Sequence, residues 1–160
     1  MRIAIHAVGR LKAGPERELT DRYLDRAAKS GRAIGITAVA SREIAESRAA
    51  RAEARKDEEA AALLADLPDG AVTIALDEGG ETIDSARFAA LVGSARDRSV
   101  PALVLLIGGA DGHGPALLAR ASLKVAFGRL TFPHQIVRIL AAEQVYRAIT
   151  ILSGHPYHRS

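Results

Sequence analysis

Four glycines are concentrated in one short segment of the chain, at positions 108, 109, 112 and 114. This segment directly follows residues 102–107, the most hydrophobic stretch of the sequence. Glycine lets a backbone bend sharply and approach a ligand closely, and open α/β sheets bind ligands beyond the carboxyl ends of their strands. A tight turn from strand to helix needs only one or two glycines, so the cluster favours a ligand-binding loop.

The common nucleotide-binding patterns do not fit this loop. A P-loop requires Gly-Lys-Ser/Thr after the strand, and the chain has none. A dinucleotide-binding Rossmann domain has its glycine-rich turn after the first strand, where residues 8–12 contain a single glycine. Such a domain also has an acid at the end of its second strand, where this chain has Ala40-Ser41. The same absences argue against the common Rossmann-like methyltransferases.

A second candidate is residues 127–134, Phe-Gly-Arg-Leu-Thr-Phe-Pro-His, which connect a predicted strand to the last predicted helix. Such a loop exposes backbone donors and acceptors that suit the edge of an adenine, although an ordinary connection is an equal alternative.

The third candidate is the C-terminal tail, which contains His155, Tyr157, His158 and Arg159. These side chains offer stacking, a group that titrates near neutrality and a phosphate ligand; the alternative is a frayed terminus. His-x-x-His without cysteine or a nearby acid is a weak metal motif, so we predict no metal site. No serine has a recognisable nucleophile setting, which argues against hydrolysis.

The elements that must position these segments alternate between strand and helix. Hydrophobic patterns predict a mainly parallel α/β fold. The strands are expected at residues 2–8, 34–40, 71–76, 102–107 and 122–127. The helices are expected to begin at Gly14-Pro15, at Ser41 (a long polar helix to about Asp66), at Asp84, at Pro115 and at Gln135. Asp77 to Gly80 are expected to end the third strand.

The last predicted helix, residues 135–153, is apolar nearly all round. This pattern predicts burial on two sides, against the core and against a partner subunit.

The composition is that of one globular domain, residues 1–160, with 48% hydrophobic and 26% charged residues. There is no cysteine, signal peptide or membrane-spanning stretch, so we expect a cytoplasmic protein with no membrane partner. The net charge is +3, but residues 120–160 carry six Lys/Arg and one acid. A basic C-terminal part is typical of contact with phosphates, and a solvated surface is the alternative.

The chain resembles the ribosomal RNA large subunit methyltransferase H family, which belongs to the SPOUT (α/β-knot) methyltransferases. The resemblance covers the whole length and is strongest in six motifs. They are Ala7-Val8-Gly9-Arg10-Leu11-Lys12, Leu76-Asp77, Leu106-Ile107-Gly108-Gly109 with Gly112, Leu130-Thr131-Phe132-Pro133-His134, Glu143-Gln144-Val145-Tyr146-Arg147-Ala148 and Tyr157-His158-Arg159.

The resemblance implies a C-terminal trefoil knot, a homodimer and S-adenosyl-L-methionine as methyl donor. It implies methylation of N3 of a pseudouridine in 23S rRNA, within assembled ribosomes that contain the large ribosomal subunit RNA. The cofactor-binding residues that it implies are Leu76, Gly108, Phe127, Gly128, Arg129, Leu130, Thr131 and Phe132. Relatives often have a small polar residue where this chain has Phe127-Gly128-Arg129, a difference that backbone recognition tolerates.

For catalysis we expect His158, or a water that it orients, to accept the N3 proton while Arg159 stabilises the developing charge. Tyr157 would position the flipped base. Lesser candidates for the same cavity are His134, Arg138 and Glu143. The tail is expected to complete the active site of the other subunit.

Two alternatives stay open at this stage. One is a knotted methyltransferase for another RNA base, and the other is a non-catalytic ribosome- or RNA-binding module with the same fold. The sequence assigns no role to the polar helix around residues 48–59.

Overall fold

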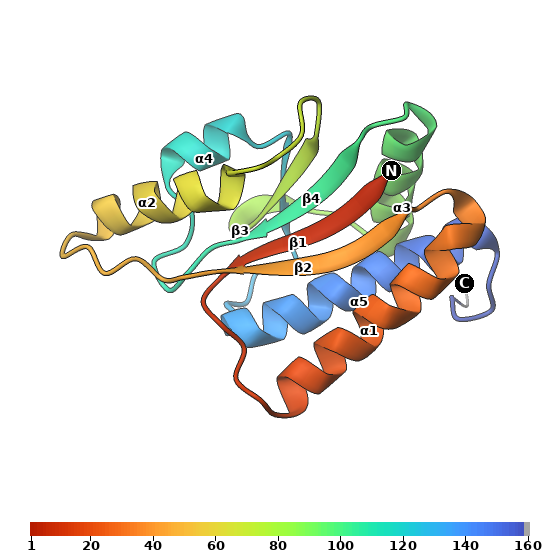
Figure 1. The fold of residues 1–160 in the computed structure, drawn as a ribbon, viewed down its shortest axis with the longest axis horizontal. Helices are drawn as coiled ribbons and strands as arrows, with labels where there is room; N and C mark the ends of the chain where they lie inside the picture. The colour runs from red at the N-terminus through yellow and green to blue at the C-terminus, as the bar shows by residue number, and fades with distance from the viewer. Residues whose placement is uncertain (159–160) are drawn as a thin grey trace.

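Five parallel strands form the central sheet of the molecule (Figure 1). The computed structural model describes residues 1–158. The strands are β1 (Arg2–Val8), β2 (Ala38–Ile44), β3 (Val72–Thr82), β4 (Ala102–Ile107) and β5 (Leu123–Ala126), in the spatial order β2-β1-β4-β3-β5. All six residues of the central strand β4 are buried. The predicted α/β class and parallel sheet are therefore confirmed.

Helices cover both faces of the sheet, as Figure 1 shows. One layer contains α1 (Pro15–Gly31), α3 (Ser85–Asp97) and α5 (His134–Ser153); the other contains α2 (Ala52–Leu64) and α4 (Pro115–Arg120). A short 3₁₀ turn, η1 (Arg32–Ile34), follows α1. Alternate residues of β4 serve the two cores, because successive side chains of a strand point to opposite faces. Leu103 and Leu105 pack with the α1 layer, and Val104 and Leu106 with the α2 layer.

The strongest local signals are confirmed. β1 and β4 have the predicted bounds. Asp84 caps α3, since its carboxylate accepts a hydrogen bond from the backbone N–H of Arg87 at 2.7 Å. Gly154 ends α5 with a left-handed φ of 67°.

The second strand and the polar helix were predicted at the wrong positions. Ser41 does not cap a helix, because β2 continues to Ile44 and α2 begins only at Ala52. Residues 38–44 pair in register with the whole of β1, and this long-range pairing outweighs the polar, helix-like pattern of the segment. Residues 32–34 form the 3₁₀ turn instead of the start of the strand.

The predicted end of the third strand was also wrong. β3 continues to Thr82, and residues 77–80 form a bulge in it: Leu76 and Glu81 both pair with Val125 of β5. At Gly80 a Cβ atom would lie 2.6 Å from the backbone nitrogen of Val125, so the bulge closes tightly against β5. Because of the bulge, Asp77 and Glu78 do not pair with residues of β5.

Helix α5 is buried mainly by its own chain, between the sheet and helices α1 and α3. This intramolecular packing accounts for most of its apolar circumference. Ile136 (37% exposed) and, just before the helix, Leu130 (74% exposed) are the large hydrophobic side chains that stay exposed among the described residues. None of the helices in the described part of the chain has the length and apolar character that a membrane crossing requires.

Candidate functional site

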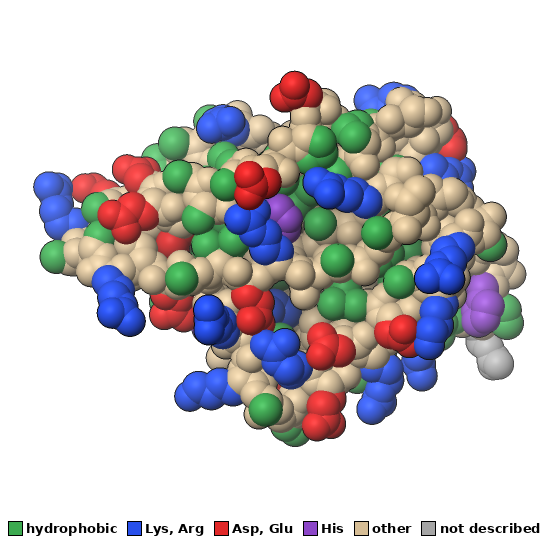
Figure 2. Space-filling view, viewed as in Figure 1, with side chains coloured by type: hydrophobic (Ala, Val, Ile, Leu, Met, Phe, Trp, Pro, Cys, Tyr) green, Lys and Arg blue, Asp and Glu red, His purple; other side chains and the backbone are tan. Residues whose placement is uncertain are grey.

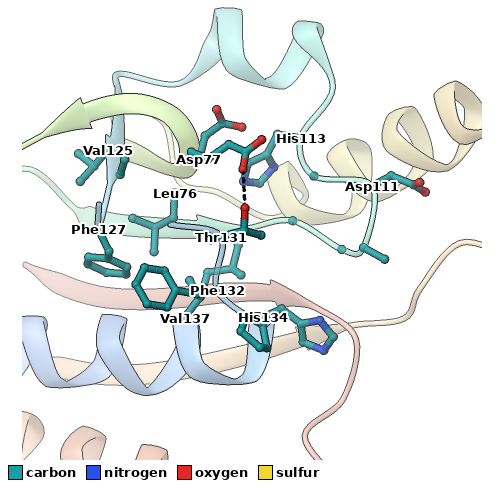
Figure 3. Close-up of a pocket in the computed structure, with 18 of the residues that line it drawn as sticks. Leu76, Asp77, Asp111, His113, Val125, Phe127, Thr131, Phe132, His134 and Val137 are labelled. Carbon is teal, nitrogen blue, oxygen red and sulfur yellow. Dashed lines mark hydrogen bonds between the residues drawn. The ribbon is translucent and has the colours of Figure 1, made fainter. Parts of the chain in front are cut away.

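The bulge in β3 and the loops that follow β4 and β5 meet at one edge of the sheet and enclose a pocket of about 680 Å³ (Figure 3). Parallel strands bring their carboxyl ends to the same edge, which explains why segments 30 to 50 residues apart in the chain come together. The lining residues are Lys56, Leu76, Asp77, Glu78, Ile107 to His113, Val125 to Gly128, Leu130 to His134 and Val137. The volume suits a ligand of the size of a nucleoside derivative.

The first wall is the glycine loop, residues 108–114. The N–H of Gly112 donates to the carbonyl oxygen of Gly109 at 3.0 Å, and Gly112 has a left-handed φ of 72°. A Cβ atom on Gly108 would lie only 2.9 Å from the carbonyl carbon of Gly112. Glycine is therefore required at position 108 by space and at 112 by conformation. The predicted ligand-binding loop does line the pocket.

The opposite wall comes from residues 127–133, which lie between β5 and α5 and form no helix or strand. All of them line the pocket except Arg129, which was predicted as a cofactor-binding residue. Gly128 has a φ of 154°, and Thr131 donates through its hydroxyl to Glu78 at 3.3 Å, the dashed line in Figure 3. The phenyl rings of Phe127 and Phe132 lie beside Leu76 in the same view. This wall combines backbone that lies outside helices and strands with flat apolar side chains, and such a surface suits a planar heterocycle.

Charged groups line the rest of the pocket. Asp77 and Glu78 come from the β3 bulge and Lys56 comes from α2. A cavity with carboxylates at one part of its wall and an ammonium at another suits a ligand that carries both signs of charge. The positions of Asp77 and Glu78 directly after a buried run could have been noticed in the sequence; nothing local indicated Lys56.

His113 is a buried pocket residue to which the sequence reasoning gave no role. Its Nε2 donates to the carbonyl oxygen of Leu106 at 3.1 Å, and 8% of the residue is exposed. Burial lowers the pKa of His113, an effect larger than the opposing one of the hydrogen bond to Leu106 and the nearby Asp77 carboxylate. The folded protein thus resists protonation of this imidazole more than the unfolded chain does.

A pH dependence of stability follows from this lowered pKa. Above a pH of about 6.5, the pKa of a histidine in an unfolded chain, His113 is neutral in both the folded and the unfolded protein, so its titration does not affect stability. As the pH falls below that value, the unfolded chain binds a proton that the folded chain resists, so the free energy of unfolding decreases. Urea titrations between pH 7.5 and 5 should show this decrease, and it should be smaller in His113→Asn. His6 is also buried, and burial lowers its pKa, so His6 should account for a further part of this decrease in the free energy of unfolding. If the free energy of unfolding decreased equally with falling pH in His113→Asn and in the parent, His113 would not be a cause of the pH dependence.

The described part of the tail, up to His158, lies outside this pocket. The ring of Tyr157 packs on Tyr146 with centroids 4.6 Å apart, its hydroxyl donates to Glu143 at 3.1 Å, and the Arg147 guanidinium lies 5.2 Å from its centroid. Burial, together with the Glu143 carboxylate, raises the pKa of Tyr157, so the phenol keeps its proton. Arg159 lies outside the described residues.

The tail and the pocket of one chain are separated along α5. The pocket contacts α5 at His134 and Val137, whereas Tyr157 packs at Tyr146, 12 residues or roughly 18 Å further along the helix axis. Figure 1 shows the segment that follows α5, up to residue 158, beside the end of the helix that is distant from His134. Within one chain, therefore, the structure does not bring Tyr157 or His158 together with the cofactor-site residues.

Three further residues were predicted for the same cavity, and they have different surroundings. His134 lines the pocket, and Glu143 belongs to the tail cluster through Tyr157 and Arg147. Arg138 is buried away from the pocket; it donates to the carbonyl oxygens of Val8 and Gly9 at 2.6 and 2.7 Å and to Glu43 at 3.2 Å. Its role is to hold the turn after β1.

Comparison with known proteins gives consistent matches over the whole chain. A family model described as "Predicted SPOUT methyltransferase" matches residues 1–158. A ribosomal RNA large subunit methyltransferase H from Rhizobium leguminosarum is 57% identical over 159 residues, 99% of each chain. The protein of the same name from Rhizobium meliloti is 58% identical over 160 residues, 100% of each chain. A solved structure, a probable methyltransferase from Bordetella pertussis, has a TM-score of 0.47 and 15% identity, covering 92% of this chain and 95% of that one.

Proposed function

Because this chain belongs to the ribosomal RNA large subunit methyltransferase H family of SPOUT methyltransferases, we propose that it methylates N3 of a pseudouridine in 23S rRNA. The methyl donor is S-adenosyl-L-methionine and the substrate is the assembled ribosome. The observation that carries the proposal is the pocket between the glycine loop and residues 127–133, in a chain similar to these methyltransferases from end to end. Ribosomes as substrate imply action in the cytoplasm.

The pocket residues fit S-adenosylmethionine. Its adenine needs a flat apolar site, for which Leu76, Phe127 and Phe132 provide the surface. Its sulfonium and amino groups are positive and its carboxylate is negative, which matches a wall with Asp77 and Glu78 and the Lys56 ammonium. The residues that would hold it are Leu76, Gly108 and residues 127–132. When bound, the donor supplies a methyl group made electrophilic by the sulfonium.

The protein's own task is to align the base and to remove its N3 proton. His158, directly or through a water, accepts that proton, and Arg159 stabilises the negative charge that develops on the ring. Tyr157, whose phenol keeps its proton, positions the base. Among the described residues, Nδ1 of His158 is buried without a hydrogen-bond partner, a costly state that a substrate or a second subunit would relieve.

The active site is shared between two subunits of a homodimer, in this proposal. The support is the distance along α5 between the tail and the pocket of one chain, which leaves each pocket in need of a second tail. Leu130, 74% exposed at the rim of the pocket, is a side chain that a partner would cover. We further propose that residues 1–160 form one catalytic unit, with the C-terminal region threaded as a trefoil knot.

The decisive experiment is methyl transfer from radiolabelled S-adenosylmethionine to three substrates: 70S ribosomes, protein-free 23S rRNA and bulk tRNA. We expect incorporation into ribosomes, at one 23S position, and little into the others. Gly108→Val should abolish incorporation, because the added side chain has no room beside Gly112. Methylation of tRNA in preference would favour the knotted methyltransferase for another RNA. Donor binding or ribosome binding without any transfer would favour the non-catalytic module.

A further inference from the structure

Helix α2 is the polar helix to which the sequence assigned no role, and it lies against the glycine loop. Figure 2 shows acidic and basic side chains interspersed over this part of the molecule. Three residues on adjoining turns of the helix approach the loop: Arg55, Lys56 and Glu59. Residues four apart share a face of a helix, so Arg55 and Glu59 present one surface to the loop.

Arg55 makes the directional contact. Its Nε donates to the carboxylate of Asp111, in the middle of the glycine loop, at 2.7 Å. Its Nη1 donates to the carbonyl oxygens of Ala49 and Ala50, at 3.0 and 3.1 Å, in the segment that leads into α2. The hydrogen bond to Arg55 lowers the pKa of Asp111. Arg55 therefore connects two otherwise irregular segments.

The remaining contacts bracket the loop at both ends. A Cβ atom on Gly109 would lie 2.9 Å from the Glu59 carboxylate, and one on Gly114 would lie 3.2 Å from Cβ of Lys56. Glu59 is itself buried and accepts a hydrogen bond from the N–H of Ser47 at 3.0 Å. The loop is thus packed against α2 at its beginning, middle and end.

A loop with four glycines in seven residues has a high conformational entropy when it is unrestrained. Between two residues of the described loop, the only backbone hydrogen bond is the one from the N–H of Gly112 to the carbonyl oxygen of Gly109. A binding site that is populated only part of the time binds its ligand more weakly in proportion. Contacts from outside the loop should therefore raise the affinity for whatever the loop holds.

We propose that Arg55 is a positioning residue: through Asp111 it holds the glycine loop in its pocket-forming conformation and so sets the affinity for the methyl donor. This inference rests on the proposed function for the identity of the ligand. It assigns the polar helix a role in preorganising the pocket, a role that does not require contact with RNA.

The test is calorimetric titration of the full-length protein with S-adenosylmethionine, without RNA. Arg55→Ala should raise the dissociation constant roughly tenfold, whereas kcat on ribosomes at saturating donor should stay within about twofold. Arg55→Lys, which can restore the ion pair, should recover part of the affinity. Asp111→Asn should weaken binding by a smaller factor, and the double variant Arg55→Ala/Asp111→Ala should be no weaker than the worse single variant.

Arg51→Ala is the matched control, since Arg51 precedes the same helix and its side chain pairs, among residues 1–158, only with the exposed Glu53. It should leave the dissociation constant unchanged. Donor binding by the parent protein with an unchanged constant in Arg55→Ala, or additive effects in the double variant, would overturn the proposal. Absence of donor binding by the parent would instead overturn the proposed function. If Arg55→Ala fails to fold by circular dichroism, Arg55→Lys decides the question, because it leaves the pocket-lining Asp111 in place and should bind the donor more weakly than the parent.

Discussion

His158→Ala and Arg159→Ala are each expected to reduce the methylation of ribosomes by about 100-fold or more, because general-base catalysis and charge stabilisation typically contribute factors of that size. The affinity for S-adenosylmethionine should change little, because the tail is proposed to act on the base, whereas the residues proposed to hold the donor are Leu76, Gly108 and residues 127–132. The measurement is the initial rate of methyl incorporation with saturating ribosomes, together with the donor's dissociation constant.

A mixing experiment tests whether the tail serves the partner's pocket. Chains with His158→Ala keep an intact pocket, and chains with Gly108→Val keep an intact tail. In a mixed dimer one composite site has both intact parts, so random mixing of two inactive proteins should restore about a quarter of the parent activity. A site formed within one chain would give no recovery at all.

His155→Ala is the control for the tail variants. His155 is exposed, three residues before His158, and among the described residues its side chain forms a hydrogen bond only with the backbone N–H of Tyr157. Its replacement should leave the rate near that of the parent. Near-parental rates in both His158→Ala and Arg159→Ala would remove the tail from the chemistry.

Arg138→Ala is expected to destabilise the protein by about 3–5 kcal/mol, the largest stability effect that we expect from a single charged residue. The Arg138 side chain is 4% exposed, and its guanidinium satisfies the carbonyl oxygens of Val8 and Gly9 as well as Glu43. Hydrogen bonds from a charged donor contribute about 1.5–3 kcal/mol each. Their loss leaves buried carbonyl groups without a partner and opens a cavity. The expected loss is a large fraction of the total stability of a small domain.

Urea unfolding monitored by circular dichroism measures this loss. Arg26→Ala is the control, because Arg26 is exposed on α1 and its loss should change stability by less than about 0.5 kcal/mol. Arg138→Met retains most of the apolar volume and should lose less than Arg138→Ala. A normal unfolding midpoint in Arg138→Ala, with loss of methyl transfer alone, would assign the residue to the active site instead.

The local patterns worked best where burial was complete. β4 was predicted with its observed bounds because a fully buried parallel strand is apolar at nearly every position. β1, which is exposed at Arg2 and partly exposed at Ala4, was predicted from the alternation of apolar and mixed positions along it. β2 was predicted too early because it is an edge strand with polar residues at 41–43, and only its pairing with β1 shows that these residues are extended. Edge strands with solvated faces carry too little hydrophobic pattern to be distinguished from a helix start.

The candidate site also has some parts that local sequence patterns predict and others that depend on long-range contacts. Residues 127–134 could equally have been an ordinary connection, and only the resemblance indicated residues 127–132 as cofactor-binding. The glycine loop could be identified as a candidate because turn chemistry is a property of consecutive residues. Arg55 and Lys56 could not, since the partner of Arg55 is 56 residues away and nothing near α2 in the sequence indicates it. The β3 bulge was equally invisible, because it depends on the register with β5.

The sequence by itself determined the order of strands and helices, the two loops that form the pocket and the resemblance that led to the methyltransferase family. Only the tertiary structure decided that Arg138 holds the turn after β1, that α2 packs on the glycine loop and that the tail lies far along α5 from its own pocket. The physical reason is one of range. Hydrophobic period and glycine conformation act over a few residues, whereas the meeting of side chains more than 50 residues apart depends on strand order and helix packing.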